Sequence, residues 1–103
     1  MKIHGLSPAT LTPFNEAFEI DYAALTEHIQ RTSNATGLYG ITVNGHAGEV
    51  LTLSSGERQQ VIATARKALP TPLKLIAGIE SHATTGWCAR DCVPKRLGQT
   101  CYW

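Results

Sequence analysis

A short loop, Gly45-His46-Ala47-Gly48-Glu49, holds the residues of this chain that are best suited to chemistry. Glycine has no Cβ, so backbone amides beside it can approach a bound anion closely and point at it. The amides of Ala47 and Gly48 are therefore candidates to bind a carboxylate. The His46 imidazole can add a hydrogen bond or, when protonated, a positive charge. We take Gly45, His46, Ala47 and Gly48 as candidate substrate-binding residues.

Two side chains of this loop have plainer interpretations that stay open. A histidine in a turn is more often a surface residue than a ligand contact. Glu49 could act as a general acid or base, but a carboxylate in such a loop more often accepts hydrogen bonds from nearby amides. We therefore predict the plainer role for Glu49.

Strands and helices alternate around this loop. Short apolar segments bounded by Gly or Pro predict buried strands, and the first of them requires its prolines to lie at its ends. The predicted order is strand, helix, strand, helix, strand, at Leu6–Phe14, 21–33, Gly37–Asn44, 54–69 and Leu73–Ile79. Alternation with short connections implies a parallel sheet with right-handed crossovers. The candidate loop then follows the second strand.

Local signals set the starts of both helices. Asp21 is a good N-cap, and Ile20 and Leu25 have the spacing of a hydrophobic staple. Ser54 and Glu57 have the spacing of a capping box, in which each side chain bonds to the backbone amide of the other residue. Both helices are therefore predicted from residues within one turn of their starts.

Four motifs make the chain resemble the dihydrodipicolinate synthase / N-acetylneuraminate lyase family. They are TLTPF (Thr10–Phe14), IDYAALTEHI (Ile20–Ile29), VNGHAGEVLTLSSGER (Val43–Arg58) and LIAGIESHAT (Leu75–Thr84). The resemblance implies a (β/α)8 barrel that forms a Schiff base between a lysine and a 2-oxo acid, usually pyruvate. It implies α/β architecture, here the first β-α-β-α-β units of an incomplete TIM barrel, because such a barrel needs about 250 residues.

The candidate loop departs from the family pattern. The family usually has Gly-Thr-Thr-Gly-Glu there, and its two threonine hydroxyls bond the substrate carboxylate and serve a proton relay. In this chain His46 and Ala47 stand in their places, so the relay hydroxyl is missing. The resemblance thus implies an oxo-acid substrate for intact relatives, held through the loop amides.

The family's catalytic lysine and tyrosine have no counterpart here. The resemblance places them on the sixth and fifth strands, beyond the third strand of this chain. The lysines present are Lys2, Lys67, Lys74 and Lys95, and none matches a family motif. Tyr39 begins the second strand instead of ending it. We therefore expect no catalytic residue, no cofactor and no activity of the chain alone.

The last residues differ in composition from the rest. Residues 1–86 contain neither Cys nor Trp, whereas the last 17 residues contain three Cys and two Trp. We expect 1–86 to be the barrel portion and 87–103 a non-family tail, out of frame or disordered. A zinc site is the alternative, with ligands His82, Cys88, Cys92 and Cys101, although the spacing fits known zinc motifs poorly. We therefore assign no metal ligand.

Composition excludes several classes of partner. A net charge of +1 and 17% charged residues give no electrostatic basis for binding nucleic acid or an anionic membrane. No apolar run has the length of a signal peptide or of a membrane span, so we expect a cytoplasmic protein.

The leading hypothesis is a truncated family member, a lyase fragment whose unpaired strand edges and apolar inner faces promote self-association or aggregation. One alternative is a small βαβαβ binding or interaction module, with metal at the Cys-rich tail. A third is a fragment that completes its barrel with a second polypeptide.

Overall fold

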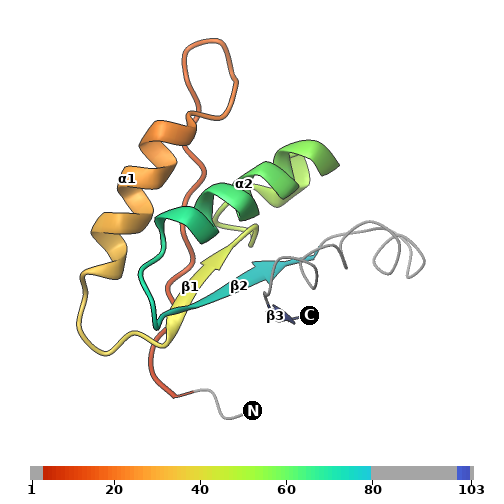
Figure 1. Ribbon diagram of the computed structural model, residues 1–103. Helices are drawn as coiled ribbons and strands as arrows, with labels where there is room; N and C mark the ends of the chain where they lie inside the picture. Colours follow the sequence, from red (N-terminus) through yellow and green to blue (C-terminus); the bar gives the residue numbers. More distant parts are fainter. Residues whose placement is uncertain (1–3, 80–99, 103) are drawn as a thin grey trace.

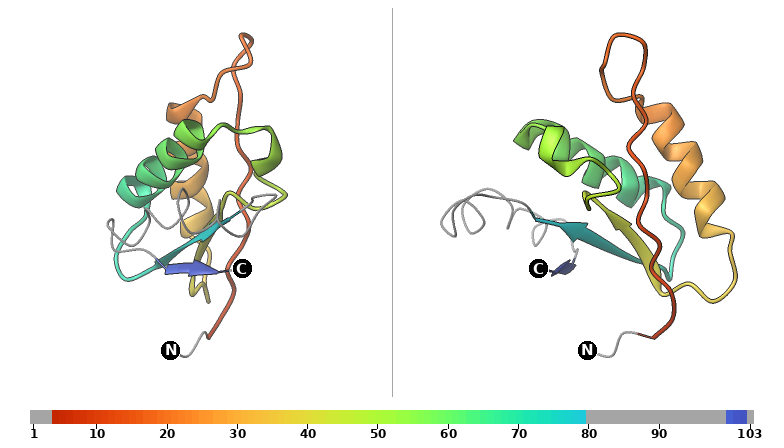
Figure 2. Two further views of the ribbon diagram at one scale, coloured as in Figure 1. Left: turned by 90° about the vertical axis from the view of Figure 1, so that its right-hand side faces the viewer. Right: turned by 180° about the vertical axis from the view of Figure 1, so that it is seen from behind.

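Two helices lie on one side of a parallel sheet in the computed structural model of the chain, which describes residues 4–79 and 100–102 (Figure 1). Two further views show that both helices stay on that side (Figure 2). No helix in this described part is long and apolar enough to cross a bilayer. The elements in chain order are α1 (Tyr22–Ser33), β1 (Gly40–Val43), the 3-10 helix η1 (Val50–Thr52), α2 (Ser55–Ala68), β2 (Lys74–Gly78) and β3 (Thr100–Tyr102).

The sheet is parallel, as predicted. Ile41 of β1 lies opposite Leu75 of β2, and Ala77 of β2 lies opposite Cys101 of β3. The strand order is β1-β2-β3. The strand predicted at 73–79 therefore does not lie at an edge of the sheet, because β3 pairs with three of its residues. Of the predicted tail at 87–103, the structure describes residues 100–102, which form this strand, and residues 87–99 and 103 lie outside the described part.

The segment before α1, predicted as the first strand, runs beside β1 without forming a continuous strand (Figure 2). The amides of Leu6 and Thr10 donate to the carbonyls of Gly37 and Thr42 at 3.1 and 2.9 Å. Pro8 lies between those two donors and has no N–H, so one bond of the ladder is missing. The segment therefore pairs through two isolated parallel bridges, one between Leu6 and Leu38 and one between Ala9 and Thr42.

Both predicted helix starts are confirmed. The Asp21 carboxylate accepts from the amide three residues later at 3.0 Å. Ser54 accepts from the Glu57 amide at 3.2 Å, and the Glu57 carboxylate accepts from the Ser54 amide at 3.0 Å, which completes the capping box. Ile20 and Leu25, the predicted staple, are both buried in the core.

The core lies between the helices and one face of the sheet. Side chains alternate along a strand, so Ile41 and Val43 of β1 and Leu75 and Ala77 of β2 share the face that packs on the helices. The helices contribute the buried residues Leu25 and Ile29 from α1 and Val61, Ile62, Ala65 and Ala68 from α2.

The face of the sheet that points away from the helices carries both polar and apolar side chains. The hydroxyls of Ser7 and Thr42 bond to each other there at 2.8 Å, and Ile76 is half-buried. Among the described residues, the large hydrophobics left exposed all lie outside β1 and β2: Leu6, Leu11, Phe14, Phe18 and Leu51. The predicted apolar inner faces are therefore not found in β1 and β2, and exposed apolar area gathers in the connecting segments.

Candidate functional site

The candidate loop leaves the carboxyl end of β1 and leads through η1 to the start of α2 (Figure 1). Asn44, which precedes the loop, and Glu49, its last residue, have left-handed backbone angles, with φ of 55° and 56°. Gly45 and Gly48 do not have positive φ. Gly48 is needed for a different reason, since a Cβ there would lie 3.2 Å from the Thr12 hydroxyl and 3.3 Å from the Thr10 carbonyl oxygen. Glycine here permits close packing of two chain segments.

Hydrogen bonds within the loop decide which amides face outward. The Gly48 amide donates to the Gly45 carbonyl at 3.1 Å, and the Glu49 amide donates to the His46 carbonyl at 3.0 Å. The Gly48 amide is therefore engaged inside the loop, which differs from the outward donor expected from the sequence. The Ala47 amide makes no hydrogen bond with the described residues, so of the two predicted donors it is the one available to an anion.

The four candidate residues differ in their exposure to solvent. His46 and Ala47 are exposed, Gly45 is half-buried and Gly48 is buried. A ligand approaching the loop would meet the His46 side chain and the Ala47 amide first. The Glu49 carboxylate is exposed and accepts no hydrogen bond from the described residues, so the predicted role of bonding nearby loop amides is wrong.

Thr12 supports the loop from the segment before α1. Its hydroxyl donates to the Gly48 carbonyl at 2.7 Å, and its side chain is buried. Thr12 is not among the candidate site residues predicted from the sequence. The TLTPF motif was the available signal, because Thr12 lies in it next to Pro13.

Asn44 supports the loop from the other side. The residue is 2% exposed, and its Nδ2 donates to the Arg58 carbonyl on α2 at 3.1 Å. Its Oδ1 is buried without a partner among the described residues. Gly78 of β2 packs against the same residue, since a Cβ on Gly78 would lie 2.2 Å from the Asn44 carbonyl oxygen. Asn44 thus joins the ends of β1, β2 and the first turn of α2.

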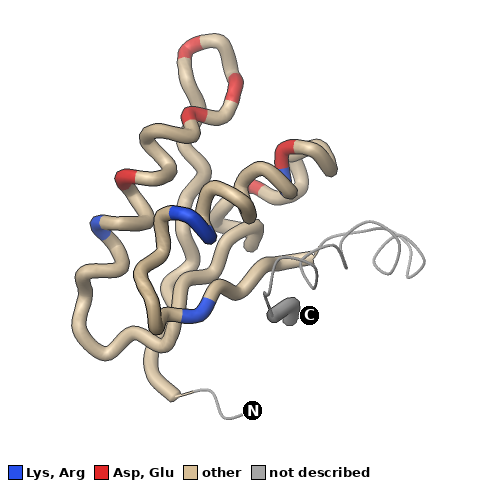
Figure 3. The backbone as a smooth tube through the Cα atoms, viewed as in Figure 1, with Lys and Arg blue, Asp and Glu red and all other residues tan. Residues whose placement is uncertain are grey.

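Charge near the loop is mainly negative. Acidic residues gather toward the end of the molecule where the helices begin, and basic residues mostly toward the other end (Figure 3). The Ser54 amide and hydroxyl hold the pKa of Glu57 below its usual range. Burial raises the pKa of the Tyr22 phenol, and the Glu57 carboxylate adds to the increase. An anion at this end needs direct hydrogen-bond donors, because the surrounding field opposes it.

The described lysines lie away from the loop. Lys74 is the first residue of β2 and is exposed, and Lys67 is exposed in the last turn of α2. Tyr39 immediately precedes β1. Lys74 and Tyr39 thus lie at the opposite end of the strands from the candidate loop. Lys2 and Lys95 lie outside the described residues.

The zinc alternative falls on residues whose side chains are outside the described part: His82, Cys88, Cys92 and Cys101. Among the described side chains, no three His, Cys, Asp or Glu residues gather as a metal site would require.

Comparison with known proteins places the chain in a family. The model of the dihydrodipicolinate synthetase family matches residues 2–91, which extends past the predicted boundary at residue 86. Human N-acetylneuraminate lyase is 40% identical over 60 residues, which are 58% of this chain and 19% of the relative. The 4-hydroxy-tetrahydrodipicolinate synthase of Magnetococcus marinus is 31% identical over 94 residues, which are 91% of this chain and 32% of the relative. The chain thus spans about a fifth to a third of these relatives.

Solved structures show the same architecture. Dihydrodipicolinate synthase from Aquifex aeolicus superposes with a TM-score of 0.85 at 33% identity, over 95% of this chain and 33% of that one. N-acetylneuraminate lyase from Mycoplasma synoviae superposes with a TM-score of 0.83 at 26% identity, over 98% of this chain and 37% of that one. The fold is therefore part of a (β/α)8 barrel, and the chain belongs to the dihydrodipicolinate synthetase family.

Proposed function

We propose that this chain is part of a lyase or synthase that acts on 2-oxo acids through a lysine Schiff base. In this proposal it supplies the loop that binds the substrate carboxylate, and it has no activity by itself. The observation that carries the proposal is the position of the loop at the carboxyl end of β1 in a family of barrels, where barrel enzymes place their active sites.

The loop offers two groups to a carboxylate. The Ala47 amide has no partner among the described residues, and the His46 side chain is exposed beside it. Hydrogen bonds from Thr12 and Asn44 hold the ends of the loop, so the donor is positioned before a ligand arrives. Such positioning lowers the entropy cost of binding. A 2-oxo acid would therefore bind through its carboxylate, with the oxo group directed elsewhere in the barrel.

The described residues support the absence of activity. A lysine becomes a nucleophile when burial or a cationic neighbour favours its neutral amine. Lys67 and Lys74 are exposed and lie away from the loop. We therefore expect no Schiff base on either residue. A cytoplasmic location remains part of the proposal, supported by the ordinary composition.

Borohydride trapping of a lysine Schiff base tests whether the chain alone is inactive. The chain is mixed with pyruvate and borohydride and its mass is measured, with an intact family enzyme as the positive control. We expect an unchanged mass for the chain and an adduct on the control. A covalent adduct on any lysine of the chain would contradict the proposal.

A titration with pyruvate tests the loop separately. We expect amide chemical shifts to move first at Ala47 and its neighbours. Ala47→Pro removes the N–H and should abolish these shifts, whereas Ala47→Gly keeps the donor and serves as the matched control. Equal shifts in the two variants would show that the anion binds elsewhere.

A further inference from the structure

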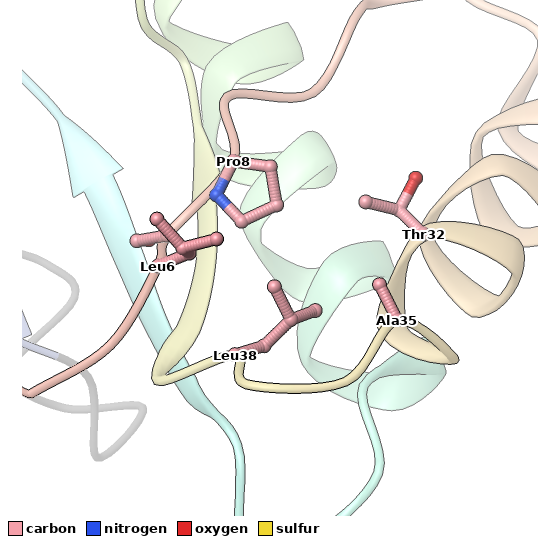
Figure 4. A pocket seen from close by; sticks show the side chains of 6 residues that line it. Leu6, Pro8, Thr32, Ala35 and Leu38 are labelled. Carbon is pink, nitrogen blue, oxygen red and sulfur yellow. The ribbon is translucent and has the colours of Figure 1, made fainter.

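An apolar pocket of about 340 Å³ lies at the amino end of β1, between the segment before α1 and the end of α1 (Figure 4). It lies beside the open outer edge of that segment, where the amides of Ser7 and Ala9 make no hydrogen bond with the described residues. The Ser7 hydroxyl bonds to that of Thr42, and the Thr32 hydroxyl donates to a carbonyl of α1, each at 2.8 Å. None of the lining side chains is titratable: Leu6, Ser7, Pro8, Thr32, Ala35 and Leu38. Reactive groups lie instead at the carboxyl end of β1.

At that end of β1, Asn44 is followed by Gly45. The side-chain amide carbon of an asparagine lies close in the chain to the peptide nitrogen of the next residue. Glycine has no Cβ that would shield this nitrogen. At Asn15 and Asn34, the other asparagines of the chain, the next residue carries a Cβ. Asn44 is therefore the asparagine whose side-chain amide is most open to attack by its neighbour.

The fold leaves the attacking nitrogen without a partner but holds the amide that must leave. The Gly45 amide makes no hydrogen bond with the described residues, and Gly78 has no Cβ, which would lie 3.3 Å from the Gly45 nitrogen. The Asn44 Nδ2 donates to the Arg58 carbonyl at 3.1 Å, and Asn44 is 2% exposed. This bond joins the end of β1 to α2, and we call it the β1–α2 joint. Attack on the Asn44 side chain requires the joint to open, because opening frees Nδ2 and admits water.

We propose that Asn44 is a self-modification site, which the Gly45 nitrogen deamidates when the β1–α2 joint opens. The Gly45 nitrogen attacks Cγ of Asn44, so that a C–N bond forms and a cyclic imide closes. The bond between Cγ and Nδ2 breaks, and Nδ2 leaves as ammonia with the proton that the Gly45 nitrogen gives up through solvent. Water then opens the imide at either of its carbonyls and yields an aspartate or an isoaspartate at position 44.

Neither product can rebuild the joint. A carboxylate has no N–H, so it cannot donate to the Arg58 carbonyl, and it places a negative charge beside that acceptor. Burial of an unpaired charge is costly, and position 44 is almost fully buried. An isoaspartate also lengthens the main chain by one methylene before Gly45. Deamidation therefore keeps the joint open and releases the candidate loop from α2, whether or not that loop binds a carboxylate.

The unsubstituted chain tests whether the fold controls the reaction. It is kept in mildly alkaline buffer with and without urea, and peptide mass spectrometry follows the mass increase that accompanies loss of each side-chain amide. We expect Asn44 to convert at least about fivefold more slowly in buffer than in urea. In urea it should convert ahead of Asn15 and Asn34. Equal rates for Asn44 in buffer and urea would overturn control by the fold, and slower conversion of Asn44 than of the other two in urea would overturn the assignment of the site.

Gly45→Ala tests the attacking nitrogen. A Cβ at position 45 would meet nothing within 4 Å, and Gly45 does not have a positive φ, so the fold should accept alanine. We expect Asn44 to convert more slowly in this variant in urea, because the Cβ shields the nitrogen. Gly56→Ala is the matched control, since a Cβ there also meets nothing within 4 Å, and in urea it should convert as the unchanged chain does. Unchanged conversion in Gly45→Ala would assign the reaction to direct hydrolysis and contradict the proposal.

Asn44→Asp tests the release of the loop. Asn15→Asp carries the same change of charge and is the control, because Oδ1 of Asn15 accepts from two backbone amides, at 2.9 and 3.0 Å, and a carboxylate can accept both bonds. We expect amide hydrogen exchange over residues 45–50 to accelerate at least about fivefold in Asn44→Asp and to stay unchanged in Asn15→Asp. Equal exchange in the two variants would show that the modification does not release the loop. The rate comparison uses the unsubstituted chain, so it decides the proposal even if Asn44→Asp does not fold.

Discussion

The Thr12 hydroxyl donates a hydrogen bond to the Gly48 carbonyl at 2.7 Å, and both residues are buried. The bond joins two positions 36 residues apart, one before α1 and the other in the loop after β1. A side chain at position 48 would crowd this hydroxyl, since the Cβ would lie 3.2 Å from it. The shape of the candidate loop therefore depends on a neighbouring segment as well as on its own residues.

Removal of this hydroxyl should loosen the loop. Thr12→Val keeps the side-chain shape but leaves the buried Gly48 carbonyl without its donor, which costs about 1–3 kcal/mol. Amide hydrogen exchange over residues 45–50 should accelerate accordingly, because exchange reports local opening without global unfolding. Thr12→Ser retains the hydroxyl and should stay close to the unchanged chain. Identical exchange in the Val and Ser variants would contradict a supporting role for the bond.

Two glycine-to-alanine substitutions should have opposite effects on the stability of the fold. Gly78→Ala would set a Cβ 2.2 Å from the Asn44 carbonyl oxygen, so the ends of β1 and β2 must separate, at about 1–3 kcal/mol. At Gly56, in the first turn of α2, a Cβ would meet nothing within 4 Å. Gly56→Ala should stabilise the helix by about 0.5–1 kcal/mol.

Amide exchange across β1, β2 and α2 measures both effects. We expect lost protection in the strands of Gly78→Ala and gained protection in α2 of Gly56→Ala. Protection of the strands in Gly78→Ala equal to that of the unchanged chain would refute the close approach to Asn44.

The capping box should make helix content depend on pH. The fold lowers the pKa of Glu57, so its ionised form is favoured in the folded state. This contribution is present above the unfolded pKa of about 4.3 and is lost as the pH falls through the lower folded value. Circular dichroism from about pH 7 to about pH 3 should show helix content declining at the acid end.

Glu57→Gln removes the titrating group while keeping a side chain that can accept from the Ser54 amide, so the acid decline should become smaller. Glu16→Gln is the control, because Glu16 is exposed and lies outside both helices. An acid decline of unchanged size in Glu57→Gln would assign the effect to other groups.

The chain alone should unfold without a cooperative transition. Its core covers one face of the sheet, while the face that carries Thr42 and Ile76 is only partly covered by the described residues. Exposed apolar residues such as Leu6 and Phe18 favour self-association. Calorimetry combined with sedimentation measures both properties. A sharp, reversible melt of a monomer would contradict this prediction and favour an independent small domain.

The elements that the sequence predicted well depend on neighbouring residues. The cap at Asp21 and the box of Ser54 and Glu57 act over three residues, and the structure contains both. Strands at Gly40–Val43 and Lys74–Gly78 follow from short β-branched or apolar runs bounded by turn residues. The motifs that carry the family resemblance are also contiguous.

The predictions that failed concern hydrogen-bond partners, which are distant in the chain for β3 and lie within the candidate loop for Gly48 and Glu49. The pairing of β3 with β2 joins residues about 24 positions apart, and no local sequence pattern at Thr100–Tyr102 predicts a strand there. The Gly48 amide turns inward because the Gly45 carbonyl lies within reach once the loop has folded. The Glu49 carboxylate accepts no hydrogen bond from the described residues, and Glu49 precedes η1 with a left-handed backbone.

The sequence by itself determined the helix starts, the parallel strand–helix order, the family and the position of the candidate loop, because each is encoded in residues close together in the chain. Only the tertiary structure decided which loop amide faces outward, that Thr12 and Asn44 hold the loop, and which edge of the sheet stays open beside an apolar pocket. The bonds from Thr12 and Asn44 and the open edge arise when segments far apart in sequence come within hydrogen-bonding distance. The outward amide is set by bonds that form inside the loop once it has folded.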